Sequence, residues 1–362
     1  MRNSRMKKKL KIGIVGCGRV FDHYLKLFKN SKNSNMELIA CCDTNLKSLK
    51  KVRQRHIQKY LDLNEMLNKE SLSLLIVLSP SSYHYQHCKL ALKKKINVLS
   101  EKPMCLKVKH GEELIKLSKK NKIFYGVVFQ NRLNTALTFL KNKIDKNKLG
   151  KIIFCNVRLI WCRYNNYYQD GWHGTWNHDG GVLNQQLIHH LDAMINIVSK
   201  IDELNSFSVT RINKLECEDS IVASFKLKNG ALGQIIGTTG YRPNDNEASI
   251  EIISDKGIYK IGGIALNEVS NWTENGLQKK YFLKKYSEKF EHGYGNGHSK
   301  LLKLLSNKLL LNKKVDNFSW SPTLALETSK VVSKIYKAIE KKKNIKMTDK
   351  FFSSKLGFSN AK

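Results

Sequence analysis

The stretch Leu10–Phe21, LKIGIVGCGRVF, decides the fold that we expect. Its apolar beginning predicts a buried strand, and the two glycines that follow, Gly16 and Gly18, have the G-x-G spacing of a tight turn. Gly16 allows the turn, whereas Gly18 allows the main chain to approach a pyrophosphate at the N-terminus of a helix that begins near Arg19 and Val20. A Phe stands where a third Gly or Ala is usual. The stretch therefore predicts a strand, a phosphate-binding turn and a helix.

Strand-like and helix-like segments alternate over residues 1–130. Because the strands are apolar throughout, both faces of their sheet should be buried, which is typical of a parallel, doubly wound sheet. We therefore expect an α/β fold with a Rossmann dinucleotide-binding domain over residues 1–130. The expected strands are 10–16, 36–43, 72–79, 96–100 and 123–129, and the expected helices are 19–30, one after 43, 82–94 and one from about 108.

Asp43 ends the second expected strand, 25 residues after Gly18. This is close to the usual spacing of the acid that binds the ribose of a dinucleotide. A carboxylate at this place repels the 2′-phosphate of NADP, so we expect NAD as the cofactor. The alternative is a doubly wound domain that binds no nucleotide.

Polar residues also follow two later strands of this half. Ser79 and His84 follow one strand, and Glu101 and Lys102 follow another. The carboxyl ends of parallel strands meet at the edge where such sheets bind ligands, so we expect all four residues beside the cofactor. Partial burial beside a second cation lowers the pKa of a lysine from about 10.4 towards working pH. A lysine at this edge, such as Lys102, can therefore be held partly desolvated.

The pattern of segments changes after Arg132. Consecutive strands joined by short turns indicate an antiparallel or mixed sheet. We expect an α+β domain over residues 131–350 with a large mixed, mostly antiparallel sheet, which binds substrate and forms oligomer contacts, and a tail over 351–362. The expected strands are 151–164, 205–213, 219–228, 231–238, 248–253 and 257–261, with a loop at 165–181 and helices at 183–198, 295–311 and 321–341.

One side of the expected helix at 183–198 is polar. At about 100° per residue, Gln185, His189 and Asp192 gather on a stripe away from the apolar face. Such a stripe usually faces solvent. In a chain that has Lys in nearly every segment, however, the absence of Lys between 174 and 199 favours an interior or cleft position.

The net charge of +34 over 362 residues is the most unusual bulk property. Of the 64 basic residues, 54 are Lys, and they occur in every segment. Nucleic-acid readers concentrate Arg and aromatic side chains on one element instead. We therefore attribute the charge to the composition of the source and expect no nucleic-acid partner.

The remaining composition indicates a cytoplasmic protein. The eight Cys form no C-x-x-C pair, which suits thiols in a reducing compartment. No apolar run approaches the roughly 18 residues of a membrane-spanning helix, and we interpret the basic start at 1–9 as a frayed end before the first strand. The spacing of His173, His178 and Asp179 fits no metal-ligand pattern, so we expect no metal.

Three motifs together resemble the Gfo/Idh/MocA oxidoreductases over nearly the whole chain. They are Gly16-Cys17-Gly18, Glu101-Lys102-Pro103 and the helix with Gly180-Gly181 before His189-x-x-Asp192. A narrower resemblance is to the UDP-N-acetyl-2-amino-2-deoxyglucuronate dehydrogenases of surface-polysaccharide synthesis. It rests on the stretches 157–176, 180–192, 261–269 and 294–301.

The resemblance implies NAD-dependent oxidation of a secondary hydroxyl, the 3-hydroxyl, of a nucleotide-linked amino sugar or uronate such as UDP-N-acetylglucosaminuronate. Lys102 matches the catalytic lysine of the family and His189 its catalytic histidine. Gln185 stands where many members have Asp and the sugar-nucleotide subgroup tends to have Asn. Which of Lys102 and His189 is the base stays open. We expect the two to face one substrate hydroxyl from opposite domains.

Further expectations concern the substrate and the assembly. Arg163 and Trp172 are expected to line the sugar-nucleotide site with Lys102, Gln185 and His189, and Arg163 to pair with a carboxylate or phosphate. The family resemblance implies a homo-oligomer, a dimer or tetramer, that covers the open face of the large sheet. The alternatives are another sugar or cyclitol dehydrogenase of the same superfamily and, more distantly, a non-catalytic NAD-binding regulator.

Overall fold

The computed structural model describes residues 9–30, 35–290, 293–311 and 317–358. Residues 1–8 of the expected frayed start and the last four residues of the expected tail lie outside the described residues. The chain divides into two compact units. Unit 1 contains residues 1–105, 109–128 and 299–323, and unit 2 contains 106–108, 129–298 and 324–362.

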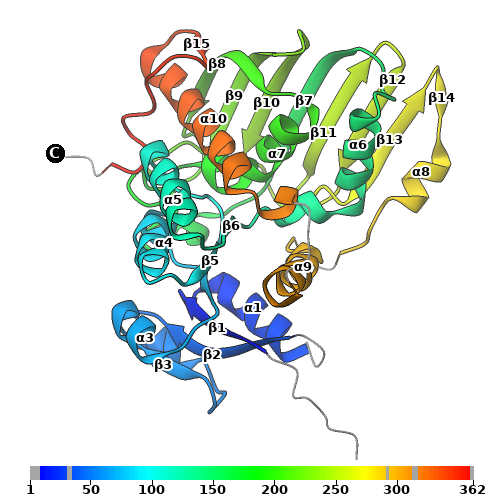
Figure 1. Ribbon diagram of the computed structural model, residues 1–362. Coiled ribbons are helices and arrows are strands. Elements are labelled where there is room, and N and C mark those ends of the chain that lie inside the picture. Colours follow the sequence, from blue (N-terminus) through cyan, green and yellow to red (C-terminus); the bar gives the residue numbers. More distant parts are fainter. Residues whose placement is uncertain (1–8, 31–34, 291–292, 312–316, 359–362) are drawn as a thin grey trace, which may run out of the picture. The chain divides into compact units, whose positions relative to one another are not determined.

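Unit 1 is built on a six-stranded parallel sheet with the strand order β3-β2-β1-β4-β5-β6. The side chains of the central strands β1 and β4 are almost wholly buried, which explains their unbroken apolar sequence. The Rossmann prediction is confirmed (Figure 1). The strands are β1 Leu10–Val15, β2 Met36–Cys42, β3 Gln58–Tyr60, β4 Leu74–Val77, β5 Asn97–Ser100 and β6 Tyr125–Val127; the helices are α1 Arg19–Asn30, α2 Leu46–Lys50, α3 Leu63–Lys69, α4 His84–Lys93, α5 Val108–Asn121 and, for its larger part, α9 Gly297–Leu311.

Unit 2 contains a nine-stranded sheet with the order β14-β13-β12-β11-β7-β10-β9-β8-β15. Among the described ladders of this sheet, only the pair β7 and β10 is parallel, so the predicted mixed, mostly antiparallel sheet is confirmed. Its strands are β7 Ile152–Ile160, β8 Ile201–Val209, β9 Ser220–Leu227, β10 Leu232–Thr238, β11 Glu247–Ser254, β12 Gly257–Gly262, β13 Glu268–Glu274, β14 Leu277–Gln278 and β15 Ile345–Lys346.

Helices cover one face of the unit 2 sheet, and no described α-helix of this unit lies over the other face, which we call the open face. The helices α6 Thr135–Asp145, α7 Ile188–Ala193 and α10 Pro322–Lys341 lie over the same face (Figure 1), and α8 Lys280–Lys285 packs beside β13. Buried residues alternate with more exposed ones along β7, β9 and β10. This alternation follows from a sheet with one covered face.

Two expected strands end differently in the structure. The strand expected at 205–213 is β8, which begins and ends four residues earlier. The main-chain N–H groups of Arg211, Ile212 and Asn213 donate to the carboxylate of Asp219, so the chain leaves the sheet to wrap around this side chain. The strand expected to reach 164 ends at Ile160, because Cys162 donates to Asp245 instead of continuing the ladder with β11.

The expected boundaries of the two halves also differ from the compact units. The change from unit 1 to unit 2 falls between Val128 and Phe129, and residues 299–323 return to unit 1. In this segment Trp320 is 1% exposed, and its ring packs against Phe124 with the centroids 5.9 Å apart. The returning segment therefore completes the core of the first unit.

The segment at 353–358, expected to be part of a tail, is bound to unit 2. Glu340 of α10 accepts hydrogen bonds from the main-chain N–H groups of Ser354 and Lys355. Leu356 is 3% exposed, and Gly357 donates to the carbonyl oxygen of Trp176, 2.8 Å away. We call residues 353–358 the C-terminal strap.

All eight cysteines are buried thiols, with no disulfide among the described residues. Five lie in unit 1 and three in unit 2. Within the described chain, we also find no helix that combines the length and apolar character needed to cross a membrane.

Candidate active site

The strands of unit 1 end in register, and this brings the predicted cofactor residues to one edge. Val15 of β1 pairs with Val77 of β4, and Val77 pairs with Ser100 of β5. Gly16, Ser79 and Glu101 therefore follow three neighbouring strand ends. This is the carboxyl edge at which doubly wound sheets bind ligands.

The turn after β1 has the shape that a dinucleotide requires. Gly16 has a φ of +95°, and a Cβ there would lie 2.5 Å from the main-chain nitrogen of Ser79, so only Gly fits. At Gly18, by contrast, no described atom beyond the glycine and its two chain neighbours lies within 4 Å of the place of a Cβ. Arg19 then begins α1, with its side chain exposed, and Val20 follows. An open glycine before a helix N-terminus fits a pyrophosphate.

Asp43 is tied to this turn. Its Oδ2 accepts a hydrogen bond from the main-chain N–H of Cys17 at 2.7 Å, and its Oδ1 accepts one from Asn45 at 2.7 Å. The side chain is half-buried. Its carboxylate is thus held in one orientation beside the glycines, at the place of the predicted ribose acid.

Glu101 is anchored by a residue that the sequence analysis did not select. The hydroxyl of Tyr24, in α1, donates to Glu101 Oε1 at 2.9 Å, and Oε2 lies 3.3 Å from the main-chain nitrogen of Lys102. Burial, followed by the charge of Glu101, holds the pKa of Tyr24 well above its usual range. Glu101 therefore fixes the start of the Lys102–Pro103 turn, and Lys102 itself is half-buried.

His84 connects the ends of β4 and β5. Its Nε2 lies 2.8 Å from the carbonyl oxygen of Ser79, and its Nδ1 lies 2.7 Å from that of Pro103. The ring is 1% exposed. The hydroxyl of Ser79 lies 2.9 Å from Nδ1 of His87. His84 therefore contacts both Ser79 and Pro103, the residue after Lys102.

In unit 2, His189 lies on α7 between two π-helical segments, Leu183–Leu187 and Met194–Val198. It is half-buried, and its ring meets the edge of Phe129 with the centroids 5.8 Å apart. Its neighbour His190 is 1% exposed, and burial lowers the pKa of His190 to about 3. His190 is therefore a neutral core residue, and only His189 of the pair is a candidate for catalysis.

Asp192 holds this helix through a buried ion pair. Its two carboxylate oxygens accept hydrogen bonds from Nη2 and Nε of Arg132 at 2.6 and 2.7 Å, and both side chains are 1% exposed. Thr328 of α10 donates to the same carboxylate at 2.6 Å. The polar stripe predicted for this helix is therefore in the interior at Asp192, while Gln185 is half-buried one turn before His189.

A buried glutamate supports the beginning of the same helical segment. Glu218 Oε1 accepts hydrogen bonds from the main-chain N–H of Leu183 at 3.1 Å and from the hydroxyl of Tyr336 at 2.9 Å. A Cβ at Gly181 would lie 2.2 Å from the carbonyl oxygen of Glu218, which explains the glycine. Burial raises the pKa of Glu218 to about 7.

The predicted substrate residues Arg163 and Trp172 have partners inside unit 2. Arg163 Nη1 donates to Asp245 at 2.9 Å, and its guanidinium lies over the ring of Trp161. Trp172 packs on the ring of His173, which pairs with Asp170 at 2.5 Å. No group of three or more metal-ligating side chains occurs among the residues that the structure describes.

The choice of Arg in a Lys-rich chain is a signal that the sequence analysis did not use. A planar guanidinium forms paired hydrogen bonds that an ammonium cannot reproduce. Among the ten Arg, Arg132 pairs with Asp192, Arg158 with Glu247 and Arg163 with Asp245. Tyr24 and Tyr336 carry no comparable signal, because a tyrosine on an apolar helix face reads as ordinary core.

The glycine turn, Asp43 and the polar strand ends of unit 1, together with the helix of His189, define a class of protein: an oxidoreductase with a dinucleotide-binding domain. The protein-family model described as "Oxidoreductase family, NAD-binding Rossmann fold" matches residues 10–129, and the family model of the GFO/IDH/MocA C-terminal domain matches residues 138–260. The two ranges together cover more than half of the chain. The chain belongs to the Gfo/Idh/MocA oxidoreductase family, which confirms the resemblance and NAD as the cofactor.

Similar proteins include sugar dehydrogenases. D-glucoside 3-dehydrogenase of Escherichia coli is 23% identical over 279 residues, which are 70% of this chain and 76% of that protein. The WlbA dehydrogenase of Bordetella pertussis, in complex with NADH and UDP-GlcNAcA, is 26% identical with a TM-score of 0.87 over 94% of this chain and 98% of its own. The Chromobacterium violaceum WlbA dehydrogenase, in the same kind of complex, is 26% identical with a TM-score of 0.86 over 95% of this chain and 97% of its own.

Proposed function

We propose that the chain is an NAD-dependent dehydrogenase that oxidises the 3-hydroxyl of a nucleotide-linked amino sugar or uronate, such as UDP-N-acetylglucosaminuronate. The observation that carries the proposal is the likeness, over nearly the whole chain, to two dehydrogenases in complex with NADH and UDP-GlcNAcA. The D-glucoside 3-dehydrogenase relative supports the 3-position. It also keeps the runner-up open, a dehydrogenase of another sugar or of a cyclitol.

The residues of unit 1 would hold the cofactor. Gly16, Gly18 and the N-terminus of α1 would bind its pyrophosphate, and Asp43 would accept hydrogen bonds from a ribose. The nicotinamide supplies the hydride acceptor when NAD is bound. The protein must then remove the proton of the reacting hydroxyl.

We propose that Lys102 and His189 together remove this proton. In one assignment Lys102 is the general base and His189 hydrogen-bonds or relays the proton; in the other, His189 is the base and Lys102 gives electrostatic support. The anchoring of the strand end before Lys102 by Tyr24 and Glu101 supports a fixed position for the lysine. The Asp192–Arg132 pair supports a fixed position for the helix of His189.

The proposal extends to the setting of the enzyme. We propose a role in surface-polysaccharide synthesis, which the narrower resemblance implies, and a place in a reducing cytoplasm, which the buried thiols suit. Arg163, Trp172 and Gln185 are proposed to contact the substrate. We propose a homo-oligomer, a dimer or tetramer.

A panel of UDP-sugars, unactivated sugars and inositols with NAD tests the substrate. We expect NADH formation with UDP-N-acetylglucosaminuronate and a 3-keto product identified by mass spectrometry. Turnover with an inositol or an unactivated sugar, and none with any UDP-sugar, would replace the proposal with the runner-up. NAD binding without turnover of any substrate would favour a regulator.

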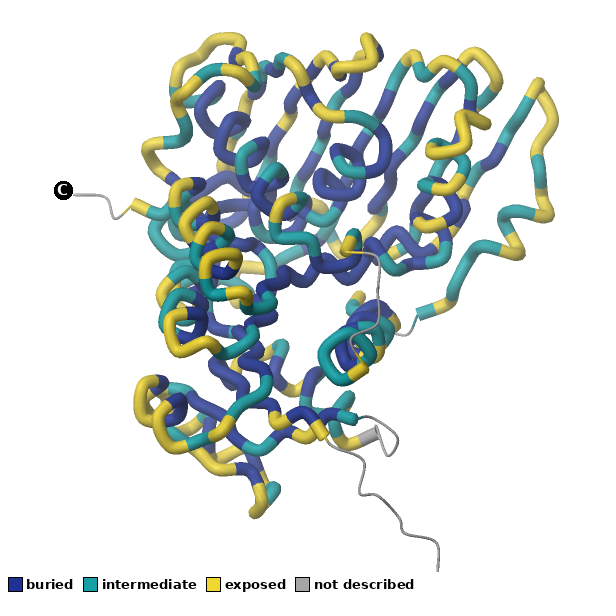
Figure 2. Tube along the Cα trace, viewed as in Figure 1, coloured by how far each residue is buried: buried dark blue, intermediate teal, exposed yellow. Residues whose placement is uncertain are grey.

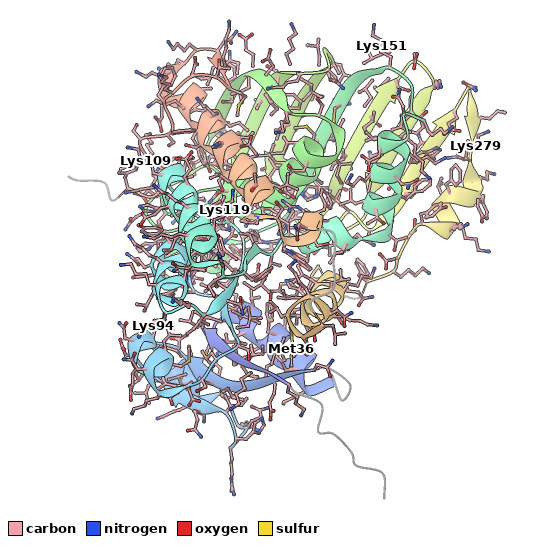
Figure 3. The ribbon with its side chains drawn as sticks, viewed as in Figure 1. Met36, Lys94, Lys109, Lys119, Lys151 and Lys279 are labelled. Atoms are coloured by element: carbon pink, nitrogen blue, oxygen red, sulfur yellow. The ribbon has the colours of Figure 1, made fainter. Side chains whose placement is uncertain are left out.

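The roles of Lys102 and His189 can be tested with single and double variants. Lys102→Ala and His189→Ala should each lower kcat by about 10²- to 10⁴-fold with NAD affinity nearly unchanged. The double variant should lose much less kcat than the product of the two single losses, because the two side chains act together on one proton. Lys94→Ala, which removes an exposed lysine of the same unit (Figure 3), is the control. A near-normal kcat together with lower thermal stability in Lys102→Ala would mean that Lys102 has a structural role at the end of the strand and no catalytic role.

A further inference from the structure

His84 faces two acceptors and no donor among its described partners. One ring nitrogen lies 2.8 Å from the carbonyl oxygen of Ser79 and the other 2.7 Å from that of Pro103. Carbonyl oxygens only accept hydrogen bonds. The ring is 1% exposed, so water cannot easily replace either contact.

The protonation state of the ring follows from this geometry. A neutral imidazole has one N–H donor and one nitrogen with a lone pair, whereas an imidazolium has two donors. A neutral His84 would therefore direct a lone pair at a carbonyl oxygen at hydrogen-bond distance. Only the doubly protonated ring makes both contacts favourable.

We propose that His84 is an imidazolium that joins the ends of β4 and β5, positions the Lys102–Pro103 turn, and presents a positive charge to Lys102. The last part of this proposal rests on the proposed function, because it assigns the charge an effect on catalysis. His84 is then a positioning residue that acts through Lys102.

The groups that surround His84 contribute with both signs. Burial, the largest influence, lowers the pKa of His84 below its usual range, and the charge of Lys102 acts in the same direction, whereas the two carbonyl contacts and the carboxylate of Glu101 oppose this shift. The proposal of an imidazolium therefore rests on the geometry, since both ring nitrogens lie at hydrogen-bond distance from carbonyl oxygens, and it goes against the effect of burial. His87, on the next turn of α4, is close to neutral because burial and His84 lower the pKa of His87 to about 4. The carboxylate whose charge acts on His84 is that of Glu101, which Tyr24 holds in place from α1. The cluster thus contains one carboxylate for two cations, His84 and Lys102.

This arrangement has a consequence for the proposed base. A cation close to an ammonium disfavours its protonated form. An imidazolium at position 84 would therefore help Lys102 to lose its proton at a lower pH. A neutral His84 would hold the turn in place without this electrostatic effect.

Nitrogen NMR of the histidine rings tests the charge without any substrate. With ¹⁵N-histidine in the full-length protein, we expect both nitrogens of His84 to give the signature of protonated nitrogens from about pH 7 to about pH 8.5, above the ordinary pKa near 6.5. The His84→Gln variant assigns the signals by their loss. One protonated and one bare nitrogen over this range would overturn the proposal. Since no turnover is needed, this result stands even if the proposed function fails.

The pH dependence of turnover tests the effect on Lys102. In His84→Gln the acidic limb of the kcat profile should move to higher pH by about one unit, because the positive charge is gone. At neutral pH kcat should fall by about tenfold, with NAD affinity within about threefold of the wild-type value. His110→Gln, which removes a histidine of α5, should leave the profile in place. A lower kcat with an unmoved limb would show a structural role only and would overturn the charge effect.

Discussion

At the scale of single residues, we propose that Asp43, beside the turn after β1, sets the preference for NAD over NADP. Two main-chain donors hold the Asp43 carboxylate, so it cannot turn away from an approaching 2′-phosphate. The sequence predicted Asp43 from its spacing to Gly18 alone. It could not predict that Cys17, a residue of the turn itself, supplies one of the donors.

The preference for NAD over NADP should depend on Asp43. We expect the wild-type protein to bind NAD more tightly than NADP. Asp43→Ser should lower the ratio of NAD to NADP affinity by about tenfold or more, because it removes the repulsion between the carboxylate and the 2′-phosphate. A tenfold change corresponds to about 1.4 kcal/mol, which is within the Coulomb energy of two charges near a protein surface. Titration of each cofactor, followed by fluorescence, measures both affinities. Tighter NADP binding by the wild type would contradict the role of Asp43.

Glu218 should make stability depend on pH. Burial raises its pKa from 4.5 to about 7 in the folded protein, so the folded state binds this proton more tightly than the unfolded state. Its contribution to stability is therefore complete below pH 4.5 and is lost as the pH rises through about 7. Glu218→Gln keeps the hydrogen-bonding shape without the charge.

The difference in unfolding free energy between Glu218→Gln and the wild type should therefore grow, in favour of the variant, by on the order of 3 kcal/mol as the pH rises from about 5 to about 8. Denaturant titrations at several pH values measure it. A difference that stays constant with pH would mean that Glu218 is ionised in the folded protein.

At the scale of elements, the helix at 183–198 shows where periodicity succeeds and where it does not. The pattern at 100° per residue predicted a helix and separated His189 from the apolar face. It could not predict the two π-helical segments, because a π turn adds a residue that side-chain types alone do not reveal. The sequence also did not predict the strands β13, β14 and β15 or the helix α8. These elements are short, or most of their residues are polar or exposed.

The C-terminal strap should stabilise the loop that leads into the helix of His189. Leu356 packs beside Gly180, where a Cβ would lie 3.2 Å from its Cδ1, and Gly357 donates to Trp176. Leu356→Ala should cost about 2–4 kcal/mol of stability. It should also speed hydrogen exchange at 174–183, measured by mass spectrometry.

Phe358→Ala, which changes a 43% exposed side chain of the same strap, is the matched control and should leave exchange at 174–183 unchanged. Equal exchange in wild type and Leu356→Ala would mean that the loop is held by its own contacts. Figure 2 shows exposed trace at the described C-terminal end, whereas Leu356 within the strap is 3% exposed.

At the scale of the whole molecule, the positive charge is spread over both units. Lys94, Lys109 and Lys119 of unit 1 and Lys151 of unit 2 are all exposed (Figure 3). The sequence was enough to predict the even spread of the positive charge and the presence of two halves with different architectures. It did not reveal that residues 299–323 belong with the first half, because packing of Trp320 on Phe124 joins segments nearly 200 residues apart.

The open face of the unit 2 sheet should form a contact between subunits. Phe207, Val222 and Ile236 are register partners across β8, β9 and β10, and Phe207 and Val222 are 70% and 42% exposed. An exposed apolar row of this kind favours association. We expect a dimer or tetramer by light scattering at low micromolar concentration.

Phe207→Lys combined with Val222→Lys should shift the protein towards monomer. Ile212→Lys, at a 56% exposed apolar position outside the strands, should not. A wild-type monomer, or dissociation by the control alone, would contradict this assignment of the interface.

The burial of every thiol has a practical consequence. A thiol reagent can modify a buried cysteine only when the surrounding structure opens. Cys17 and Cys88 report on unit 1, and Cys155 and Cys217 on unit 2. Modification rates resolved by peptide mass spectrometry would therefore give the opening free energy of each unit from one sample. The native chain already carries the labels for measuring whether its two halves unfold together or one after the other.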